Sequence, residues 1–194
     1  MGVTPETGDG AEPAEIVTQK LSELPKHVQD IFANDPVVVQ PALNSLRKLL
    51  SLETRPPIQK CIDAGVVPRL VALLGCNDHP ELQFEAAWAV TNIVSGTQEQ
   101  TAEVVKCGAV EALLPLMTCG DAEVRAQAVW ALANICGDSP WCRDYVLRLG
   151  AMEPLLKLLM APNPSLRIQR DATWMLSNMC RGKDAPWDII SPGV

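Results

Sequence analysis

Histidine is scarce in this sequence, and its cysteines lack metal-binding spacing. The 194 residues contain 2 histidines, His27 and His79, and 7 cysteines with no CxxC pair among them. Zinc sites need cysteine and histidine ligands at set spacings, and a disulfide framework uses an even number of cysteines. We therefore predict no metal site and no disulfide. The cysteines are interpreted as free thiols in a reducing compartment, the cytosol or the nucleus.

Long apolar runs and catalytic motifs are also missing. No stretch reaches the roughly 20 apolar residues that a membrane-spanning helix requires. The opening segment, MGVTPETGDGAEPAE, has neither the basic start nor the apolar centre of a secretory signal. No G-x-S-x-G, P-loop, paired-carboxylate or Cys/His motif is present. The sequence therefore indicates neither a membrane protein nor an enzyme, and it predicts no cofactor.

Basic residues do not outnumber acidic residues in this sequence. Aspartate and glutamate number 23 against 16 lysines and arginines, for a net charge of −7. A chain of this charge is repelled by nucleic acid and by anionic membranes, and it favours encounters with basic partners. We therefore expect a basic protein or peptide as partner, with no nucleic acid and no membrane.

What the sequence does contain is a repeat marked by tryptophan. Three similar segments, QFEAAWAVTNIVSG, RAQAVWALANICGD and QRDATWMLSNMCRG, follow one another with their tryptophans 42 and 44 residues apart. Each tryptophan is followed four residues later by an asparagine, giving the pairs Trp88 and Asn92, Trp130 and Asn134, and Trp174 and Asn178. A period in the low forties is typical of stacked helical repeats. Since residues four apart share one face of a helix, the stack should present a Trp–Asn ladder.

Each repeat unit is predicted to contain three helices, so the fold class is all-α. The first helices, PIQKCIDAG, TAEVVKCGA and CRDYVLRLG, end at glycines that permit a left-handed backbone, namely Gly65, Gly108 and Gly150. The second helices, VVPRLVALL, AVEALLPLM and AMEPLLKLL, are apolar on most faces and so should be buried. The third and longest helices carry the Trp–Asn pairs.

We divide the chain into three parts: an acidic, disordered tail over 1–22, a repeat domain over 23–183 and a C-terminal tail over 184–194. The repeat domain divides into a partial first repeat and three full ones, over 34–56, 57–97, 98–139 and 140–183. Residues 23–32 are predicted to form a short helix that covers the end of the stack. Pro41 is expected to kink the helix of the partial repeat or delay its regular part.

These segments resemble importin alpha, the armadillo-repeat receptor for nuclear localisation signals. The resemblance is carried by RKLLS at 47–51, LQFEAAWAVTNIVSGT at 82–97, QAVWALANICGDSP at 127–140 and ATWMLSNMCRGK at 172–183, and it extends from about residue 24 to residue 183. It implies a right-handed armadillo-repeat superhelical solenoid of about three and a half repeats. It also implies a protein of the cytoplasm and the nucleus.

In importin alpha the third helices line a concave groove that binds basic nuclear localisation signals as extended peptides. The resemblance therefore implies a peptide-binding site made of Trp88, Asn92, Ser95, Gly96, Thr97, Thr101, Gln127, Trp130, Asn134, Gly137, Asp138, Trp174, Asn178 and Arg181. It implies that Asp138 pairs with the principal lysine of the signal, beside the polar loop that starts at Ser95.

The chemistry of these residue types suits a lysine-rich strand. An asparagine amide offers a donor and an acceptor to an extended main chain. Indole faces cover the aliphatic stems of lysines, and a cation over an indole gains about 0.5–2 kcal/mol. A carboxylate such as Asp138 adds a charge-assisted hydrogen bond to an ammonium group.

The sequence departs from the family at two groove positions and in its first residues. Ala126 stands where the family usually has Glu, and Asp171 stands where it usually has Asn. The family recruits importin beta through an Arg/Lys-rich segment, whereas residues 1–26 hold only Lys20 and Lys26, so we expect no docking of importin beta.

A second interpretation stays open. The chain could be an armadillo scaffold, or a competing truncated paralogue, that binds another extended partner without transport activity. It could also self-associate through an uncapped C-terminal end, because the terminal face of a solenoid must be polar or covered.

Overall fold

The computed structural model describes residues 14–53 and 55–190, and within these ranges every regular element is a helix. The elements are α1 (Ala14–Ile31), α2 (Pro36–Leu50), α3 (Ile58–Asp63), α4 (Val66–Leu74), α5 (Pro80–Ile93), α6 (Gln98–Lys106), α7 (Ala109–Leu113), the 3-10 helix η1 (Pro115–Thr118), α8 (Ala122–Asp138), α9 (Pro140–Arg148), α10 (Met152–Leu159), α11 (Leu166–Met179) and α12 (Trp187–Ile190). None of the described helices is long and apolar enough to cross a membrane.

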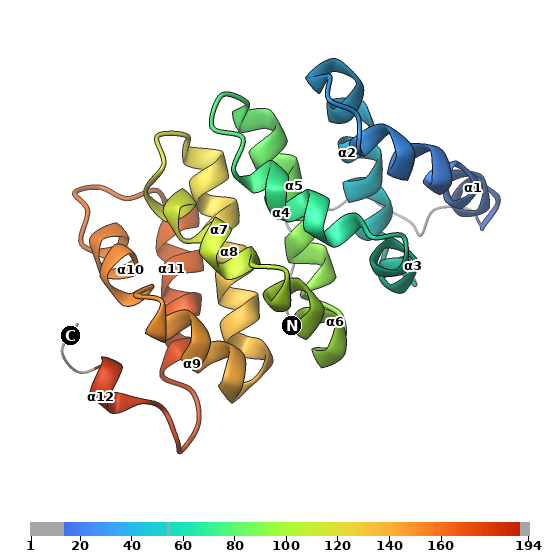
Figure 1. Ribbon diagram of the computed structural model, residues 1–194. Coiled ribbons are helices and arrows are strands. Elements are labelled where there is room, and N and C mark those ends of the chain that lie inside the picture. Colours follow the sequence, from blue (N-terminus) through green and yellow to red (C-terminus); the bar gives the residue numbers. More distant parts are fainter. Residues whose placement is uncertain (1–13, 54, 191–194) are drawn as a thin grey trace.

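The longest helices of successive repeats form one layer. α2, α5, α8 and α11 follow one another across the molecule, each packed against the next (Figure 1). The shorter helices connect and cover them, with α4 against α5, η1 and α9 against α8, and α10 against α11. The chain therefore forms a stack of three-helix units with one continuous layer of third helices.

The third helices can lie close together because their buried positions carry small residues. In α5 these include Ala86, Ala87 and Ala89, and in α8 Ala128 and Ala131, all of them fully buried. A helix that packs on neighbours at both sides must be apolar around most of its circumference. The layer is therefore a core in itself, and only one strip of each third helix is left facing solvent.

Local sequence signals start the helices. Asp35 accepts a hydrogen bond from the backbone N–H of Val37 at the start of α2, and Asp121 does the same for the first turn of α8. Ser165 caps α11. Gly65 and Gly108 have φ of 73° and 84°, a left-handed conformation that turns the chain from a first helix directly into a second.

The prediction of a disordered tail over 1–22 is wrong for residues 14–22, which belong to α1; residues 1–13 lie outside the described residues. Average composition concealed the spacing of apolar side chains in this segment. Leu24 and Ile31 are buried against the core, and Leu21 and Val28 pack beside them. This is the three-to-four-residue spacing of an amphipathic helix, and α1 packs against α2. The helix begins at Ala14, ahead of the predicted 23–32.

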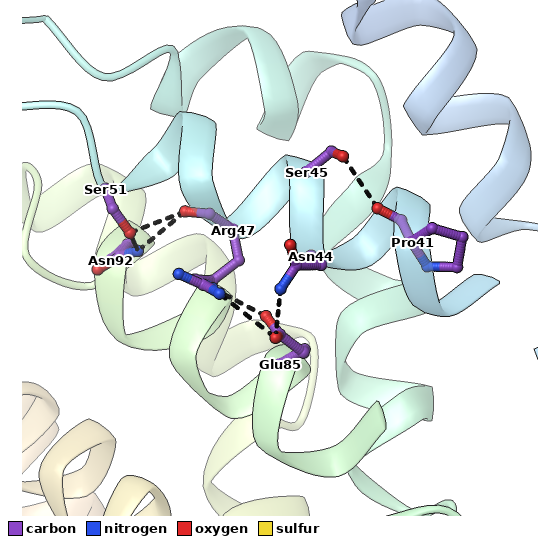
Figure 2. Close-up of polar contacts among 7 residues, drawn as sticks. All are labelled: Pro41, Asn44, Ser45, Arg47, Ser51, Glu85 and Asn92. Carbon is purple, nitrogen blue, oxygen red and sulfur yellow. Dashed lines mark hydrogen bonds and ion pairs between the residues drawn. The ribbon is translucent and has the colours of Figure 1, made fainter. Parts of the chain in front are cut away.

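The proline within α2 does not divide that helix. α2 runs without a break from Pro36 to Leu50, and Pro41 lies within it. One turn after Pro41, the hydroxyl of Ser45 donates to the Pro41 carbonyl at 2.9 Å (Figure 2). At the other end of the stack, α12 packs on α9, while Met160 remains 82% exposed. Self-association through this end stays a prediction.

Removal of a buried leucine from the third-helix layer should destabilise the whole stack. Leu132 of α8 is fully buried, so Leu132→Ala leaves a cavity and should cost about 2–5 kcal/mol in the free energy of unfolding. Denaturant unfolding followed by circular dichroism measures this cost. The control Met160→Ala alters an exposed side chain and should change the free energy by less than about 0.5 kcal/mol. Equal effects of the two substitutions would contradict this packing.

Candidate functional site

The solvent-facing strips of α5, α8 and α11 form the walls of a groove of about 930 Å³. We define the groove by its lining residues, which are Phe84, Trp88, Thr91, Asn92, Val94, Ser95, Glu123, Gln127, Trp130, Asn134, Gly137, Asp138, Leu166, Arg167, Arg170, Trp174, Asn178 and Arg181. All three Trp–Asn pairs are among them because residues four apart lie on the same helical face. The groove is therefore the surface on which the ladder is displayed.

The three indoles differ in how open they are. Trp174 is 43% exposed, whereas Trp88 and Trp130 are half-buried. Phe84 packs edge-on against Trp88, with ring centroids 5.6 Å apart and planes at 77°. Trp174 is thus the most accessible of the three ladder indoles.

A guanidinium group of the chain itself lies over Trp88. The Cζ of Arg47, from α2, is 4.2 Å from the centroid of the indole. Its Nε donates to Glu85 Oε2 at 2.8 Å, and a second nitrogen donates to Glu85 Oε1 at 3.4 Å (Figure 2). Asn44 also donates to Glu85, at 2.6 Å. Arg47 is therefore held in place from two sides, and it shows that this ring accepts a cation.

A second guanidinium lies over Trp130. The Cζ of Arg170, from α11, is 5.2 Å from the centroid of this indole. Its Nε donates to Asp171 Oδ1 at 2.8 Å. Arg170 and Phe84 each stand four residues before a ladder tryptophan, a spacing that the sequence already shows. In the turn before the tryptophans, sequence reasoning considered Ala126, Gln127 and Asp171, and it named neither Phe84 nor Arg170.

Two ladder asparagines are used to join helices. Asn92 donates to the hydroxyl of Ser51 at 2.8 Å and to the Arg47 carbonyl at 3.4 Å, which ties α5 to the end of α2 (Figure 2). Asn178 is 1% exposed and donates to the Ala133 carbonyl at 2.8 Å. A Cβ on Gly137 would approach Asn178 Nδ2 to 2.9 Å, so the absence of a side chain at this position makes room for the carboxamide.

Asn134 differs from the other two asparagines. It is half-buried in the groove wall, and its carboxamide has no hydrogen-bond partner within residues 14–53 and 55–190. A carboxamide presents two N–H donors and an acceptor oxygen. In the free protein, Asn134 is thus the ladder asparagine with its full hydrogen-bonding capacity available.

Asp138 ends α8 one turn beyond Asn134. The thiol of Cys142 donates to its carboxylate at 3.8 Å, and Gln98 donates to its backbone carbonyl at 3.1 Å. No basic side chain of the described part of the chain forms an ion pair with this carboxylate. Burial raises the pKa of the Cys142 thiol, so this neighbour stays neutral. Asp138 therefore offers an uncompensated negative charge at the groove.

The polar loop after α5 is only partly in the groove. Ser95 lines it, but Gly96, Thr97 and Thr101 do not. Thr97 caps α6 through the backbone N–H of Gln100, and Thr101 is fully buried with its hydroxyl donating to the Val94 carbonyl at 3.4 Å. In this structure the Thr101 hydroxyl serves the fold, and its implied role in binding stays a prediction.

Gln127 and Arg181 do line the groove. Gln127 is 4% exposed; it donates to the Thr91 hydroxyl at 3.0 Å and accepts from Arg167 at 3.2 Å. It therefore contributes to the floor of the groove as a link between third helices. Arg181 is exposed just after the end of α11.

Asp171, one of the two departures from the family pattern, does not line the groove. Asp171 is 3% exposed, and its Oδ2 accepts no hydrogen bond. The Nε of Arg167 lies 3.8 Å from that oxygen. Burial raises the pKa of the Asp171 carboxyl, although the guanidinium groups of Arg170 and Arg167 oppose the shift. The second departure, Ala126, is buried in α8.

The repeated units of the chain match those of a known family. A family model, the Armadillo/beta-catenin-like repeat, matches residues 54–95, 97–137 and 138–181. The chain belongs to this family. The predicted armadillo fold is confirmed by this match.

The predicted resemblance to importin alpha is also confirmed. The chain is 49% identical over 187 residues to importin subunit alpha-4 of Arabidopsis thaliana, a match that covers 96% of this chain and 35% of that protein. It is 50% identical over 177 residues to importin subunit alpha-B of Dictyostelium discoideum, covering 90% and 34%. It is 53% identical over 157 residues to importin subunit alpha-8 of Mus musculus, covering 81% and 31%. The chain spans about a third of the length of these relatives.

Solved structures with the same fold include designed proteins. A designed armadillo repeat protein in complex with the peptide (KR)4 matches with a TM-score of 0.84 at 28% identity, over 94% of this chain and 76% of that chain. An engineered protein matches with a TM-score of 0.80 at 33% identity, over 88% and 69%.

Neutralisation of Asp171 should stabilise the protein at neutral pH. The pKa of this carboxyl is raised above 3.8 in the folded state, so the folded protein holds the proton more tightly and loses stability as pH rises through the folded pKa. Asp171→Asn cannot ionise. Thermal unfolding should give a higher Tm than wild type at about pH 7, and the difference should disappear below pH 3.8.

The matched control is Asp188→Asn, which neutralises an exposed aspartate of α12 and should leave the Tm difference near zero at each pH. A lower Tm for Asp171→Asn at neutral pH would contradict the dominance of burial over the ion pairs with Arg170 and Arg167.

Proposed function

We propose that this chain is a non-enzymatic receptor for nuclear localisation signals, acting as an adaptor in nuclear protein import. It binds Lys/Arg-rich segments of cargo proteins in extended form along the groove, in the cytoplasm and the nucleus. The proposal is carried by one observation: the accessible indole of Trp174, the free carboxamide of Asn134 and the unpaired carboxylate of Asp138 all face a single groove.

Each of these groups has a part in holding an extended basic strand. The Asn134 carboxamide can donate to a peptide carbonyl and accept from a peptide N–H, which suits a main chain in β conformation. The Asp138 carboxylate can accept from a lysine ammonium, a charge-assisted hydrogen bond that gains about 1.5–3 kcal/mol. Trp174 can cover the aliphatic stem of a neighbouring lysine.

The chain's own arginines support cation binding by the indoles. Arg47 lies 4.2 Å from the Trp88 ring and Arg170 lies 5.2 Å from the Trp130 ring, so a guanidinium already fits against each surface. The (KR)4 complex of a designed armadillo protein supports basic peptides as ligands of this fold. The net charge of −7 adds long-range attraction for such peptides.

We do not propose that residues 1–26 bind importin beta. Residues 1–26 hold two lysines and no arginine, whereas the family uses an Arg/Lys-rich segment for this contact. We propose that binding of a basic peptide does not depend on this stretch.

Removal of the two free polar groups should weaken peptide binding. The double variant Asn134→Ala with Asp138→Ala deletes one carboxamide and one carboxylate, and the Kd for a fluorescent (KR)4 peptide at low salt should rise by at least about tenfold. Fluorescence anisotropy of the labelled peptide measures the Kd.

The matched control is Asn34→Ala with Asp78→Ala, which removes the same chemical groups from exposed positions outside the groove. Its Kd should equal that of wild type. Saturable binding that both double variants retain equally would contradict the groove as the site, and would favour a scaffold for a different partner.

Trp174 should contribute to binding through its exposed ring. Trp174→Ala should raise the Kd for (KR)4 by about 2- to 30-fold, the equivalent of one cation–π contact. Trp187→Ala removes an indole that is 55% exposed on α12 and lies outside the groove, and it should leave the Kd unchanged. Isothermal titration calorimetry measures both values, and a Kd insensitive to Trp174 would exclude a lysine subsite on this ring.

A further inference from the structure

Three large apolar or aromatic side chains lie on a solvent-exposed face of α9, outside the groove. Trp141 is 55% exposed, Leu149, which caps the helix, is 39% exposed, and Tyr145 is half-buried. Each follows the one before it by four residues, so all three lie on one helical face and form a continuous ridge. None of them lines the groove. We name Trp141, Tyr145 and Leu149 the α9 ridge.

The α9 ridge is absent from the other repeat units. Counted back from Gly65 and Gly108, the positions equivalent to the ridge hold Pro56, Lys60 and Ala64 in one unit and Glu99, Glu103 and Cys107 in the next. Lys60, Glu99 and Glu103 are exposed to solvent. The units therefore stack without aromatic side chains at these positions, and the ridge is not a requirement of the repeat.

The two rings of the α9 ridge are held in place within the chain. Trp141 stacks on Tyr145, with ring centroids 5.6 Å apart and planes at 4°. The Tyr145 hydroxyl donates a hydrogen bond to the carboxylate of Glu111, from α7. That hydrogen bond raises the pKa of Tyr145, so the phenol keeps its proton and the bond persists at neutral pH. The rings therefore lose little further freedom when another molecule packs on them.

Two charged side chains beside the α9 ridge lack a partner of opposite sign. Glu111 is exposed, and its carboxylate pairs with no basic side chain in the described part of the chain. Arg148, next to Leu149, is exposed and forms no side-chain hydrogen bond or ion pair within residues 14–53 and 55–190. The ridge is therefore bordered by one uncompensated carboxylate and one uncompensated guanidinium.

A helix fits this surface better than an extended peptide or a second copy of the chain. An extended peptide needs a sheet edge or a row of carboxamides to pair with its main chain, and α9 has neither. A second copy brings the same net charge of −7, which opposes association. A stable dimer also buries about 800 Å² on each partner, more than three partly exposed side chains supply.

We propose that the α9 ridge docks an amphipathic helix of a partner protein, one that brings a lysine or arginine to Glu111 and a carboxylate to Arg148. Such a helix presents apolar side chains at spacings of three and four residues, which pack alongside a ridge of four-residue spacing. Trp141 is the anchor, because a large ring that is fixed before docking gives contact area at a small loss of entropy. This surface is separate from the groove, and the inference does not depend on the proposed function.

The experiment uses the full chain and a designed helical peptide. The amphipathic peptide is a hydrocarbon-stapled helix of about 20 residues, with leucines along one face, lysines on one flank and glutamates on the other. The scrambled peptide has the same composition and staple, but its leucines do not share a face. Fluorescence anisotropy should show saturable binding of the amphipathic peptide and at least about tenfold weaker binding of the scrambled one.

Trp141→Ser should raise the Kd of the amphipathic peptide by at least about tenfold, because it removes the anchor. The matched control is Trp187→Ser, which removes an indole of the same 55% exposure from α12 and should leave this Kd unchanged. Circular dichroism should show that both variants are folded.

Glu111→Gln tests the charge and keeps the local structure, because the glutamine oxygen can still accept from Tyr145. It should raise the Kd of the amphipathic peptide by about 2- to 5-fold, the effect of one exposed ion pair. It should have no effect on a version of the peptide whose lysines are replaced by norleucine.

Three results would overturn the inference: equal binding of the amphipathic and scrambled peptides, equal losses in Trp141→Ser and Trp187→Ser, or an equal effect of Glu111→Gln on the lysine and norleucine peptides. Sedimentation equilibrium of the free chain gives a separate check. A dimer that Trp141→Ser abolishes would also overturn the inference, since a second copy would then occupy the α9 ridge.

Discussion

The close stacking of the third helices is the constraint on which the rest of the molecule depends. α5 and α8 each have a third helix on both sides and shorter helices behind, so their buried faces are filled with alanine, valine and leucine. Only one strip of each helix can then carry polar or large amphipathic side chains. The groove exists because this strip recurs at the same place in each repeat. The strips of neighbouring third helices therefore lie side by side.

The same closeness gives the polar residues of the strip two different uses. Asn92 and Asn178 find acceptors on the preceding helix and join the repeats. Asn134 finds none in the described part of the chain, so its carboxamide is left unpaired. Identical residues at equivalent positions thus divide into structural links and an unpaired carboxamide, according to whether an acceptor lies within hydrogen-bonding distance.

Charge is distributed unevenly across the groove. Arg167 and Arg170 stand on the N-terminal half of α11, where Glu123 and the buried Asp171 pair with them. The Asp138 carboxylate ends α8 at the opposite side, and no cation of the described residues pairs with it. The groove therefore carries an unpaired carboxylate at one edge and arginines paired with carboxylates at the other.

The sequence by itself determined the helical class, the repeat and the content of the ladder. The period of about forty residues predicts stacked units, and the four-residue spacing of Trp130 and Asn134 places them on one helical face. These properties depend on a single helix and its copies, so they can be read from spacing alone. The family resemblance, carried by the same segments, then predicted the armadillo fold.

Only the tertiary structure decided how the ladder is used. Thr101 is fully buried with its hydroxyl donating to the Val94 carbonyl, and the helix predicted over 23–32 begins at Ala14. The arginines over Trp88 and Trp130 come from helices that are distant in sequence from those rings. Such contacts depend on distances between helices, and a pattern within one helix does not encode those distances.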